Sequence, residues 1–270
     1  MRVALAKKPK SQGPGLLLLV VALVVVAVAG ARFFGFVPGR DGGGRPPGDG
    51  PRVVEEGPSG GAGVLPRPQQ MTEVLIYHTH TTENYSPKAT HATDGAGDVA
   101  AVGRALVEEL EKQGVNSVHL LTVHDLPQWG GAAQNARTSV AEALERNSGV
   151  RIVLDIHRDA IADPPAESGY ASAVIDGEEV AKLLLIVGTG NNPRVDANIR
   201  FAERLKDRLE QLAPGITRGV RVLPRETNGD LHDHHVTVYV GDYRDTTPEE
   251  AARAMRWLAT AVAELLREDG

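Results

Sequence analysis

Residues 74–85 read Val-Leu-Ile-Tyr-His-Thr-His-Thr-Thr-Glu-Asn-Tyr, an apolar run followed at once by two histidines and a carboxylate. The apolar run predicts a strand, with the polar residues at its end. If the strand continues, His78 and His80 share one face, and Glu83 lies one turn further on and can fold back towards them. Imidazole and carboxylate groups are usual zinc ligands, and a catalytic zinc needs three protein ligands and one open position. The stretch therefore predicts one half of a metal site.

A third histidine, His157, follows a second strand-like run of sequence Ile-Val-Leu-Asp-Ile. Four of the five residues 155–159 are polar or charged, and an apolar strand gains no packing from them. One interpretation is an ion-paired strand end, in which Arg158 binds Asp155 or Asp159. That interpretation leaves His157 without a purpose, whereas a metal site would use it as a ligand from a second strand. We therefore predict that His157 completes the site.

The distribution of charge separates two parts of the 270-residue chain. Residues 1–70 carry nine Lys and Arg against four Asp and Glu, while residues 71–270 carry 20 against 31. This excess of carboxylates disfavours nucleic acid as a partner, because the phosphate backbone rewards clustered Lys and Arg. The chain has no cysteine, so a zinc site has to be built from His, Asp or Glu.

An unbroken apolar stretch, residues 16–31, follows four basic residues near the N-terminus. As a helix it would rise about 24 Å, slightly less than the roughly 30 Å hydrocarbon core of a membrane. We predict an uncleaved single-pass anchor within residues 1–37, with a cytoplasmic N-terminus and the rest of the chain outside the cell membrane. The alternative is a cleavable signal peptide, since residues 27–29 read Ala-Val-Ala and fit the small-residue cleavage pattern. Both interpretations export the remainder of the chain.

The rest of the chain divides into a linker and a globular part. Residues 38–70 are rich in Gly and Pro and lack apolar periodicity, which predicts a disordered linker. From residue 71 to residue 270, strand-like runs alternate with amphipathic helices, which predicts one α/β domain with a mainly parallel sheet and helices on both faces. In such sheets, functional groups gather beyond the carboxyl ends of the strands. The expected elements are helices near 99–110, 134–146, 195–212 and 248–265, strands at 118–123 and 152–156, a hairpin over 171–187 with Asp176-Gly177 in its turn, and a capping box at Thr247, Pro248 and Glu250.

A second histidine cluster, formed by His232, His234 and His235, follows Asn-Gly-Asp at residues 228–230. Those preceding residues favour turn conformations, and the spacing of the histidines does not resemble a paired motif on a helix. We therefore interpret this cluster as a turn and not as a metal site. The other three histidines, His91, His119 and His124, are interpreted as loop or surface positions.

Five separated motifs resemble those of one family, in the same order along the chain. They are Ile-Tyr-His-Thr-His-Thr-Thr-Glu-Asn-Tyr at 76–85, Asp-Ile-His-Arg-Asp-Ala at 155–160, Val-Gly-Thr-Gly-Asn at 187–191, Pro-Gly-Ile-Thr-Arg-Gly at 214–219 and Asn-Gly-Asp-Leu at 228–231. Together they resemble stage II sporulation protein P over nearly all of residues 71–270, and the anchor and linker also fit. The resemblance implies a fold like that of the zinc-dependent N-acetylmuramoyl-L-alanine amidases, and a peptidoglycan hydrolase with amidase and endopeptidase activity. It also implies a role in engulfment of the forespore, alongside stage II sporulation proteins D and M.

The resemblance also assigns roles to particular residues. It implies that His80, Glu83 and His157 bind Zn²⁺, with His78 as the alternative to His80. The family carries a glutamate near the C-terminus as the expected catalytic acid/base, and Tyr239 stands at that position here. Tyrosine has a pKa near 10 in model peptides and is a poor general base at neutral pH.

Two interpretations follow from Tyr239. Either another carboxylate, Asp230 or Asp242, takes the place of the glutamate and the chain is a zinc amidase, or the chain is a degenerate homologue. Such a homologue would bind peptidoglycan or partner proteins without hydrolysis. Strand alternation places Asp242 on the opposite face from Tyr239, so Asp230 is the candidate that we retain.

Overall fold

Two apolar strands, β2 (Val74–Tyr77) and β4 (Ile152–Asp159), lie side by side near the middle of the sheet and supply the two halves of the predicted site. The computed structural model describes residues 55–56, 71–161 and 169–269. Within these residues, seven strands form one sheet in the order β1-β3-β2-β4-β9-β7-β8. The other five strands are β1 (Glu55–Glu56), β3 (Ser117–Leu120), β7 (Leu183–Gly188), β8 (Thr217–Leu223) and β9 (His235–Asp242).

The sheet is mainly parallel, as predicted. Parallel pairing joins β3 to β2, β2 to β4 and β4 to β9, so these four strands end at the same edge of the sheet. The strand β7 runs antiparallel to β9 and pairs in parallel with β8, while the short β1 pairs antiparallel with β3. The prediction of an α/β domain is confirmed, and the reversed pair β7–β8 is the feature that the sequence patterns did not indicate.

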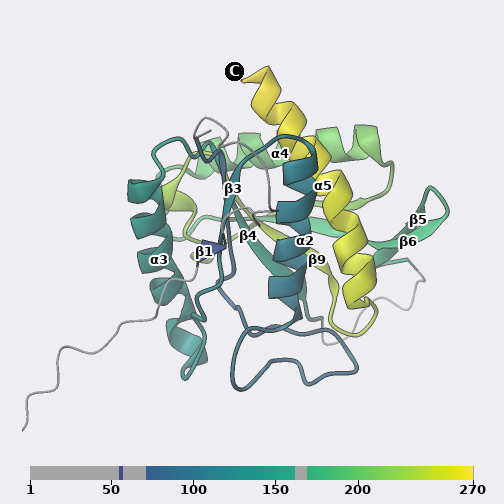
Figure 1. Cartoon of the computed structure of the whole chain (residues 1–270), viewed down its shortest axis with the longest axis horizontal. Coiled ribbons are helices and arrows are strands. Elements are labelled where there is room, and N and C mark those ends of the chain that lie inside the picture. Colours follow the sequence, from purple (N-terminus) through teal and green to yellow (C-terminus); the bar gives the residue numbers. More distant parts are fainter. Residues whose placement is uncertain (1–54, 57–70, 162–168, 270) are drawn as a thin grey trace, which may run out of the picture. The chain divides into compact units, whose positions relative to one another are not determined.

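Helices cover both faces of the sheet, and the alternation of side chains along the strands decides which helix each face meets (Figure 1). Val74 and Ile76 of β2 belong to the core formed with α2, α4 and α5. Leu75 and Tyr77 of the same strand face the other way and belong to a smaller core formed with α3. Within the described residues the α-helices are α2 (Asp98–Lys112), α3 (Ala132–Arg146), α4 (Val195–Leu212) and α5 (Pro248–Glu268).

Local signals in the sequence fix the start of α5. The hydroxyl of Thr247 accepts a hydrogen bond from the N–H of Glu250 at 3.2 Å, and the Glu250 carboxylate accepts one from the N–H of Thr247 at 3.0 Å. This reciprocal pair satisfies two of the N–H groups that a helix leaves free at its start. The predicted capping box is therefore confirmed.

The predicted hairpin is only partly correct. Asp176 and Gly177 turn the chain with φ angles of 54° and 81° between β5 (Ser172–Ile175) and β6 (Glu178–Ala181), which form a separate two-stranded sheet. The second arm was expected to continue to residue 187. Instead β6 ends at Ala181, and the apolar run that follows forms β7 of the large sheet.

The predicted anchor, residues 16–31, lies outside the described residues. Within the described part of the chain, no helix is long and apolar enough to cross a membrane. The predicted linker, residues 38–70, is described only at Glu55–Glu56, which pair with His119 and Leu120 of β3.

Candidate metal centre

The chain leaves β2 at Tyr77 and turns, and this turn separates the two histidines of the His-Thr-His motif. The Nδ1–H of His78 donates to the carbonyl of Ile156 at 2.8 Å, and its Nε2 lies 2.8 Å from Nε2 of His119. His78 and His80 would share one face only if the strand continued through them. It ends at Tyr77, so they do not. His78 is fully buried among these partners, whereas His80 points to the edge of the sheet where β4 ends.

Threonine hydroxyls hold this turn against the loop that follows β3. The hydroxyl of Thr81 donates to the carbonyl of Thr122 at 2.8 Å. The hydroxyl of Thr82 donates to Oδ2 of Asp125 at 2.7 Å, and its N–H lies 3.3 Å from the same oxygen. Two loops at the carboxyl ends of neighbouring strands are thereby tied together.

His80, Glu83 and His157 come together at the carboxyl edge of the sheet. Each offers one ligand atom, a ring nitrogen or a carboxylate oxygen, and these atoms all lie within 4.8 Å of one another. Glu83 and His157 are buried, and His80 is partly exposed. Two imidazoles and one carboxylate converging from one loop and one strand form a donor set that suits zinc and leaves room for a further ligand.

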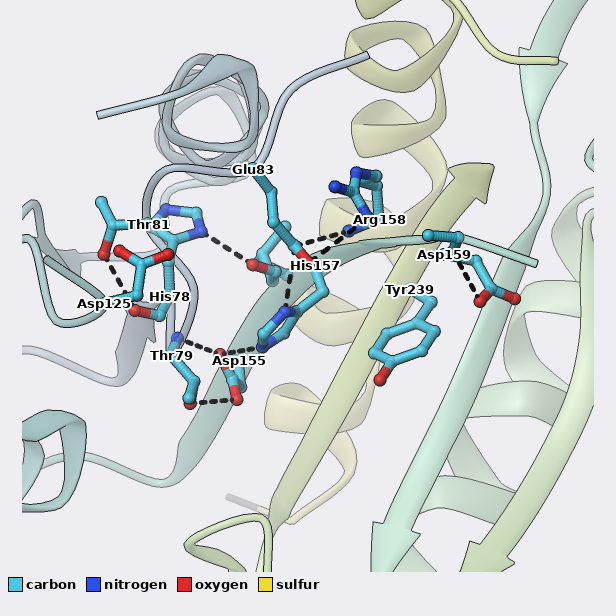
Figure 2. A network of polar contacts seen from close by, with 12 residues as sticks. His78, Thr79, Thr81, Glu83, Asp125, Asp155, His157, Arg158, Asp159 and Tyr239 are labelled. Atoms are coloured by element: carbon cyan, nitrogen blue, oxygen red, sulfur yellow. Dashed lines mark hydrogen bonds and ion pairs between the residues drawn. The ribbon is translucent and has the colours of Figure 1, made fainter. Parts of the chain in front are cut away.

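His157 lies between two carboxylates (Figure 2). Its Nδ1 is 3.0 Å from Oε2 of Glu83, and its Nε2 is 3.0 Å from Oδ1 of Asp155. Burial alone would lower the pKa of His157, but the charges and hydrogen bonds of Asp155 and Glu83 outweigh it and raise that pKa well above its ordinary value. In the metal-free protein His157 is therefore an imidazolium at neutral pH.

The acceptor Asp155 is fixed from its other side by Thr79. The N–H and the hydroxyl of Thr79 each donate to the Asp155 carboxylate at 2.8 Å. Although burial opposes ionisation, the charge of His157 and these hydrogen bonds hold the pKa of Asp155 below its ordinary range. Asp155 is thus a permanent anion that orients the ring of His157, which is the usual role of a carboxylate behind a metal-binding histidine.

Arg158 holds the carboxylate of Glu83. The backbone N–H of Arg158 lies 3.2 Å from Oε2 of Glu83, and Nη1 lies 3.6 Å from Oε1. Burial would raise the pKa of Glu83, yet the positive charges of His157 and Arg158 lower it. The alternative interpretation, an ion pair of Arg158 with Asp155 or Asp159, is wrong, since Asp155 binds His157 and Asp159 binds Arg218 at 2.9 Å.

His80 differs from His157 in its electrostatic surroundings. Burial, followed by the charge of His157, lowers the pKa of His80 to about 4. Its ring is consequently neutral at neutral pH, which is the protonation state that a metal ligand requires. Its ring stacks face to face on Trp129, with centroids 3.8 Å apart and an interplanar angle of 10°.

A glycine allows the loop after Glu83 to return against the site. A Cβ on Gly97 would lie 2.2 Å from the carbonyl oxygen of Glu83 and 2.4 Å from that of Thr82, a separation that no side chain tolerates. The N–H of Gly97 donates to the carbonyl of Thr81 at 2.8 Å, and α2 begins at the next residue. The close packing at Gly97 therefore sets where α2 starts relative to the site.

Tyr239 lies on β9 directly beside His157 of β4, with ring centroids 5.6 Å apart (Figure 2). Its hydroxyl accepts a hydrogen bond from Nη1 of Arg225 at 3.0 Å. The position at which a catalytic glutamate was expected is therefore next to the ligand cluster, and it carries a phenol paired with a guanidinium.

Neither candidate carboxylate joins the group of His80, Glu83 and His157. Asp230, in the short 3₁₀-helix η2 (Gly229–Leu231), makes a bidentate pair with Arg137 at 2.7 and 2.6 Å, and this pairing lowers its pKa. Asp242 is buried and accepts hydrogen bonds from the N–H groups of Ile161 and Arg244 at 3.0 Å each. Asp230 is thus engaged by a side chain of α3, and Asp242 by backbone N–H groups of two loops.

The remaining histidines serve the fold. The ring of His235 lies 2.9 Å from the hydroxyl of Tyr77, and Nδ1 of His234 lies 3.2 Å from the carbonyl of Arg151. The interpretation of His119 as a loop or surface position is wrong, because it lies on β3 and is fully buried. His124 lies in the loop after β3, as interpreted, and it too is fully buried. His119 contacts His78, and Nδ1–H of His124 donates to the carbonyl of His78 at 2.7 Å.

Three parts of the site were not expected from the sequence: Asp155 as the partner of His157, Arg158 as the partner of Glu83, and Trp129 against His80. The order Asp-Ile-His on a strand places Asp155 and His157 on one face, so that pair had a signal in the sequence. Trp129 had none, because it belongs to a separate loop.

Comparisons with known proteins agree on one family. The sequence profile described as stage II sporulation protein P matches residues 54–263. Stage II sporulation protein P of Bacillus subtilis (strain 168) is 28% identical over 209 residues, an alignment that covers 71% of this chain and 50% of that protein. The chain therefore spans about half the length of the curated relative that it matches.

Solved structures offer distant likenesses. The N-acetylmuramoyl-L-alanine amidase AmiC2 of Nostoc punctiforme is 14% identical with a TM-score of 0.42, covering 73% of this chain and 96% of that one. The CwlD amidase from Clostridioides difficile, solved with the GerS lipoprotein, is 13% identical with a TM-score of 0.44, covering 73% and 97%. At TM-scores this low, neither likeness assigns a function.

Proposed function

Because this chain belongs to the stage II sporulation protein P family, we propose that it is a membrane-anchored, zinc-dependent N-acetylmuramoyl-L-alanine amidase of sporulation. Its substrate would be peptidoglycan, and the bond cut would be the amide between muramic acid and the stem peptide. The observation that carries the proposal is the convergence of His80, Glu83 and His157 within 4.8 Å at the carboxyl edge of a parallel sheet. Stage II sporulation proteins D and M are its proposed partners, and the membrane its proposed location through residues 16–31.

The residues of the site fit a zinc ion in number and kind. His80, Glu83 and His157 would hold it, and their two nitrogens and one oxygen are the donors of many hydrolytic zinc sites. Zinc bound there would act as a Lewis acid that polarises the scissile carbonyl, and it would lower the pKa of a bound water to about 7. The chain's own residues then have to orient the ligands and move one proton.

Orientation is the part that the surrounding residues provide best. Asp155, held by Thr79, accepts from the second nitrogen of His157 and so fixes the plane of that ring. Arg158 restrains the carboxylate of Glu83 through its backbone N–H and its guanidinium. Both partners are buried, so they lose little when the substrate displaces solvent from the site.

Proton transfer is the part for which the chain is least equipped. Asp155 is the nearest further carboxylate, and its lowered pKa makes it a weak base. Tyr239 is placed beside His157 and can donate its hydroxyl proton in a hydrogen bond while Arg225 donates to its oxygen. This arrangement supports a slow hydrolase, and it also motivates the second candidate, a family member that binds peptidoglycan without cutting it.

The two candidates are separated by measuring metal and activity on one sample. The purified full chain is assayed for zinc by elemental analysis and for release of stem peptides from isolated cell wall. The amidase proposal expects about one zinc per chain and peptide release that disappears in His157→Ala. Zinc at that stoichiometry without any peptide release would favour the binding protein, and a chain that takes up no zinc would contradict the amidase.

A further inference from the structure

Trp129 is the aromatic residue among the few large apolar side chains that are exposed in the described residues. Its exposed fraction is 45%, and the others in this class are Met71, Val174 and Val222. It opens the short 3₁₀-helix η1 (Trp129–Gly131), at the start of α3. An indole that is nearly half exposed gives up part of the stabilisation that burying a large aromatic ring provides, so a role beyond packing is expected for it.

The indole lies against His80, and the two predicted histidine ligands differ in what holds their rings. Both ring nitrogens of His157 face carboxylates. Among the hydrogen bonds found in the described part of the chain, none involves the imidazole of His80, whose ring instead stacks on Trp129 at 3.8 Å and 10°. A metal-binding histidine normally has its second nitrogen held by an acceptor, which sets the orientation of the ring. At His80 the stacking contact is what sets that orientation.

The position of Trp129 is itself fixed by the two loops that meet at the site. The loop that leads to η1 is bound to the His80 loop through Thr82 and Asp125 at 2.7 Å. The indole also contacts the ring of His91, which meets it nearly edge-on, with centroids 4.2 Å apart and an interplanar angle of 73°. Three segments therefore contribute one aromatic ring each to a cluster of His80, Trp129 and His91.

We propose that Trp129 is a positioning residue of the metal centre, which holds the plane of His80 by stacking in place of a hydrogen bond. The inference rests on the proposed function, because it takes His80 as a zinc ligand. A metal ion withdraws electron density from the imidazole that binds it, and a ring that carries more positive charge is attracted more strongly to the face of an indole. The stack therefore favours the metal-bound state, as well as restricting the rotation of the ring.

The test measures the zinc affinity of the full chain by competition with a chelator of known affinity. Loss of a partner that orients a metal ligand typically weakens metal binding by about 10- to 100-fold, and we expect a loss in this range for Trp129→Ala. Trp129→Phe keeps an aromatic face and should stay within about threefold of the wild type. Trp257→Phe is the matched control, because the chain has only two tryptophans and Trp257 lies on α5, stacked on Arg256.

A second measurement distinguishes positioning from a general effect on folding. In the Trp257→Phe chain the whole tryptophan emission comes from Trp129, so titration with Zn²⁺ or with the quencher Co²⁺ should change it, and His80→Ala should abolish that change. Trp129→Ala should leave the thermal midpoint of the metal-free chain unchanged, since the side chain is half exposed.

The outcomes separate this inference from the function on which it rests. If Trp129→Ala binds zinc as tightly as the wild type, Trp129 is not a positioning residue, whereas the proposed metal site stands. If the metal-free variant melts earlier and the phenylalanine variant loses affinity equally, the effect is one of folding and the inference also fails. If the wild type binds no zinc and its Trp129 emission does not respond, the metal site itself fails.

Discussion

Two groups of histidines occupy the two ends of the central strands, and they do different work. His80 and His157 lie at the carboxyl edge of the sheet, where they meet the carboxylates of Glu83 and Asp155. His232, His234 and His235 lie where β9 begins, and their polar partners are a tyrosine hydroxyl and backbone groups. The second group is denser in the sequence, yet within the described residues only the first brings three ligand-type atoms together.

The two groups of histidines differ in the carboxylates that surround their rings. In the second group burial lowers the pKa values of His232 and His235, and the charge of the buried Asp155 raises that of His235 too little to offset the burial. In the first group two buried carboxylates raise the pKa of His157 despite its burial. Convergence of histidine with carboxylate from separate strands, and not the number of histidines in a segment, marks the site that suits a metal.

Removing one histidine from each group should give the largest difference in zinc binding. His157→Ala deletes a proposed ligand and leaves Glu83 and Asp155 facing each other without the charge between them, so zinc affinity should fall by well over 100-fold, beyond the loss typical of an outer partner. His234→Ala, in the second group, should leave zinc binding unchanged. Chelator competition on both variants measures the contrast, and equal losses in the two would contradict the division into a metal site and a structural cluster.

A substitution that increases activity would test whether the first group is a catalytic site. Tyr239→Glu places a carboxylate beside His157, and a well-placed general base typically contributes about 100- to 10,000-fold to a rate. We expect the rate of stem-peptide release to rise by about 100-fold. The uncharged control Tyr239→Gln should not increase this rate. A wild-type rate already equal to that of the glutamate variant would show that this chain obtains its proton transfer elsewhere.

The protonation of His157 predicts how zinc binding depends on pH. Its raised pKa means that the metal-free ring carries a proton at neutral pH, and the metal has to displace that proton. Zinc affinity should therefore rise up to about tenfold per pH unit as pH increases towards that pKa. His80, with a pKa of about 4, adds no proton to this count above pH 5.

Calorimetry in two buffers of different ionisation enthalpy measures the protons released. About one proton per zinc, from His157, is expected at pH 6, where zinc-bound water with a pKa of about 7 keeps its protons. A release of two protons would place the imidazolium at His80 as well, and a release of none would mean that the two carboxylates do not keep His157 charged.

The sequence was sufficient for the parts of this molecule that depend on local patterns. Alternating strands and helices, the capping box at Thr247 and the strand that carries His157 follow from periodicity and turn chemistry, and the structure agrees with them. The hairpin arm was misjudged because an apolar run such as Val180 to Val187 reads the same whether it stays with its neighbour or crosses to another sheet.

The sequence predicted which residues meet at the site, but not the contacts around them. His80 and Glu83 share one loop, His157 was predicted from its place at the end of a second strand, and the structure brings the three together. Which histidine of the His-Thr-His motif reaches the cluster depends on where β2 ends, and a boundary of one or two residues decides it. The contact of Trp129 with His80 depends on the packing of two loops, for which the sequence carries no periodic signal.

The smallest expected effect concerns the second group and appears in stability alone. Burial lowers the pKa of His235 to about 4, whereas in the unfolded chain it is about 6.5. Below pH 6.5 the unfolded chain therefore takes up a proton that the folded chain does not, and stability falls as pH decreases towards 4, by at most about 1.4 kcal/mol per pH unit for this one residue.

His235→Gln retains an acceptor for the hydroxyl of Tyr77 and cannot take up that proton, so its loss of stability between pH 7 and pH 5 should be smaller than that of the wild type. Urea unfolding of the metal-free chain at both pH values measures the difference, while zinc affinity at pH 7 should not change. An equal acid sensitivity in variant and wild type would assign the effect to other buried histidines such as His78 and His119, whose pKa values burial lowers to about 4 and about 2. A change in zinc affinity would contradict the separation of the two groups.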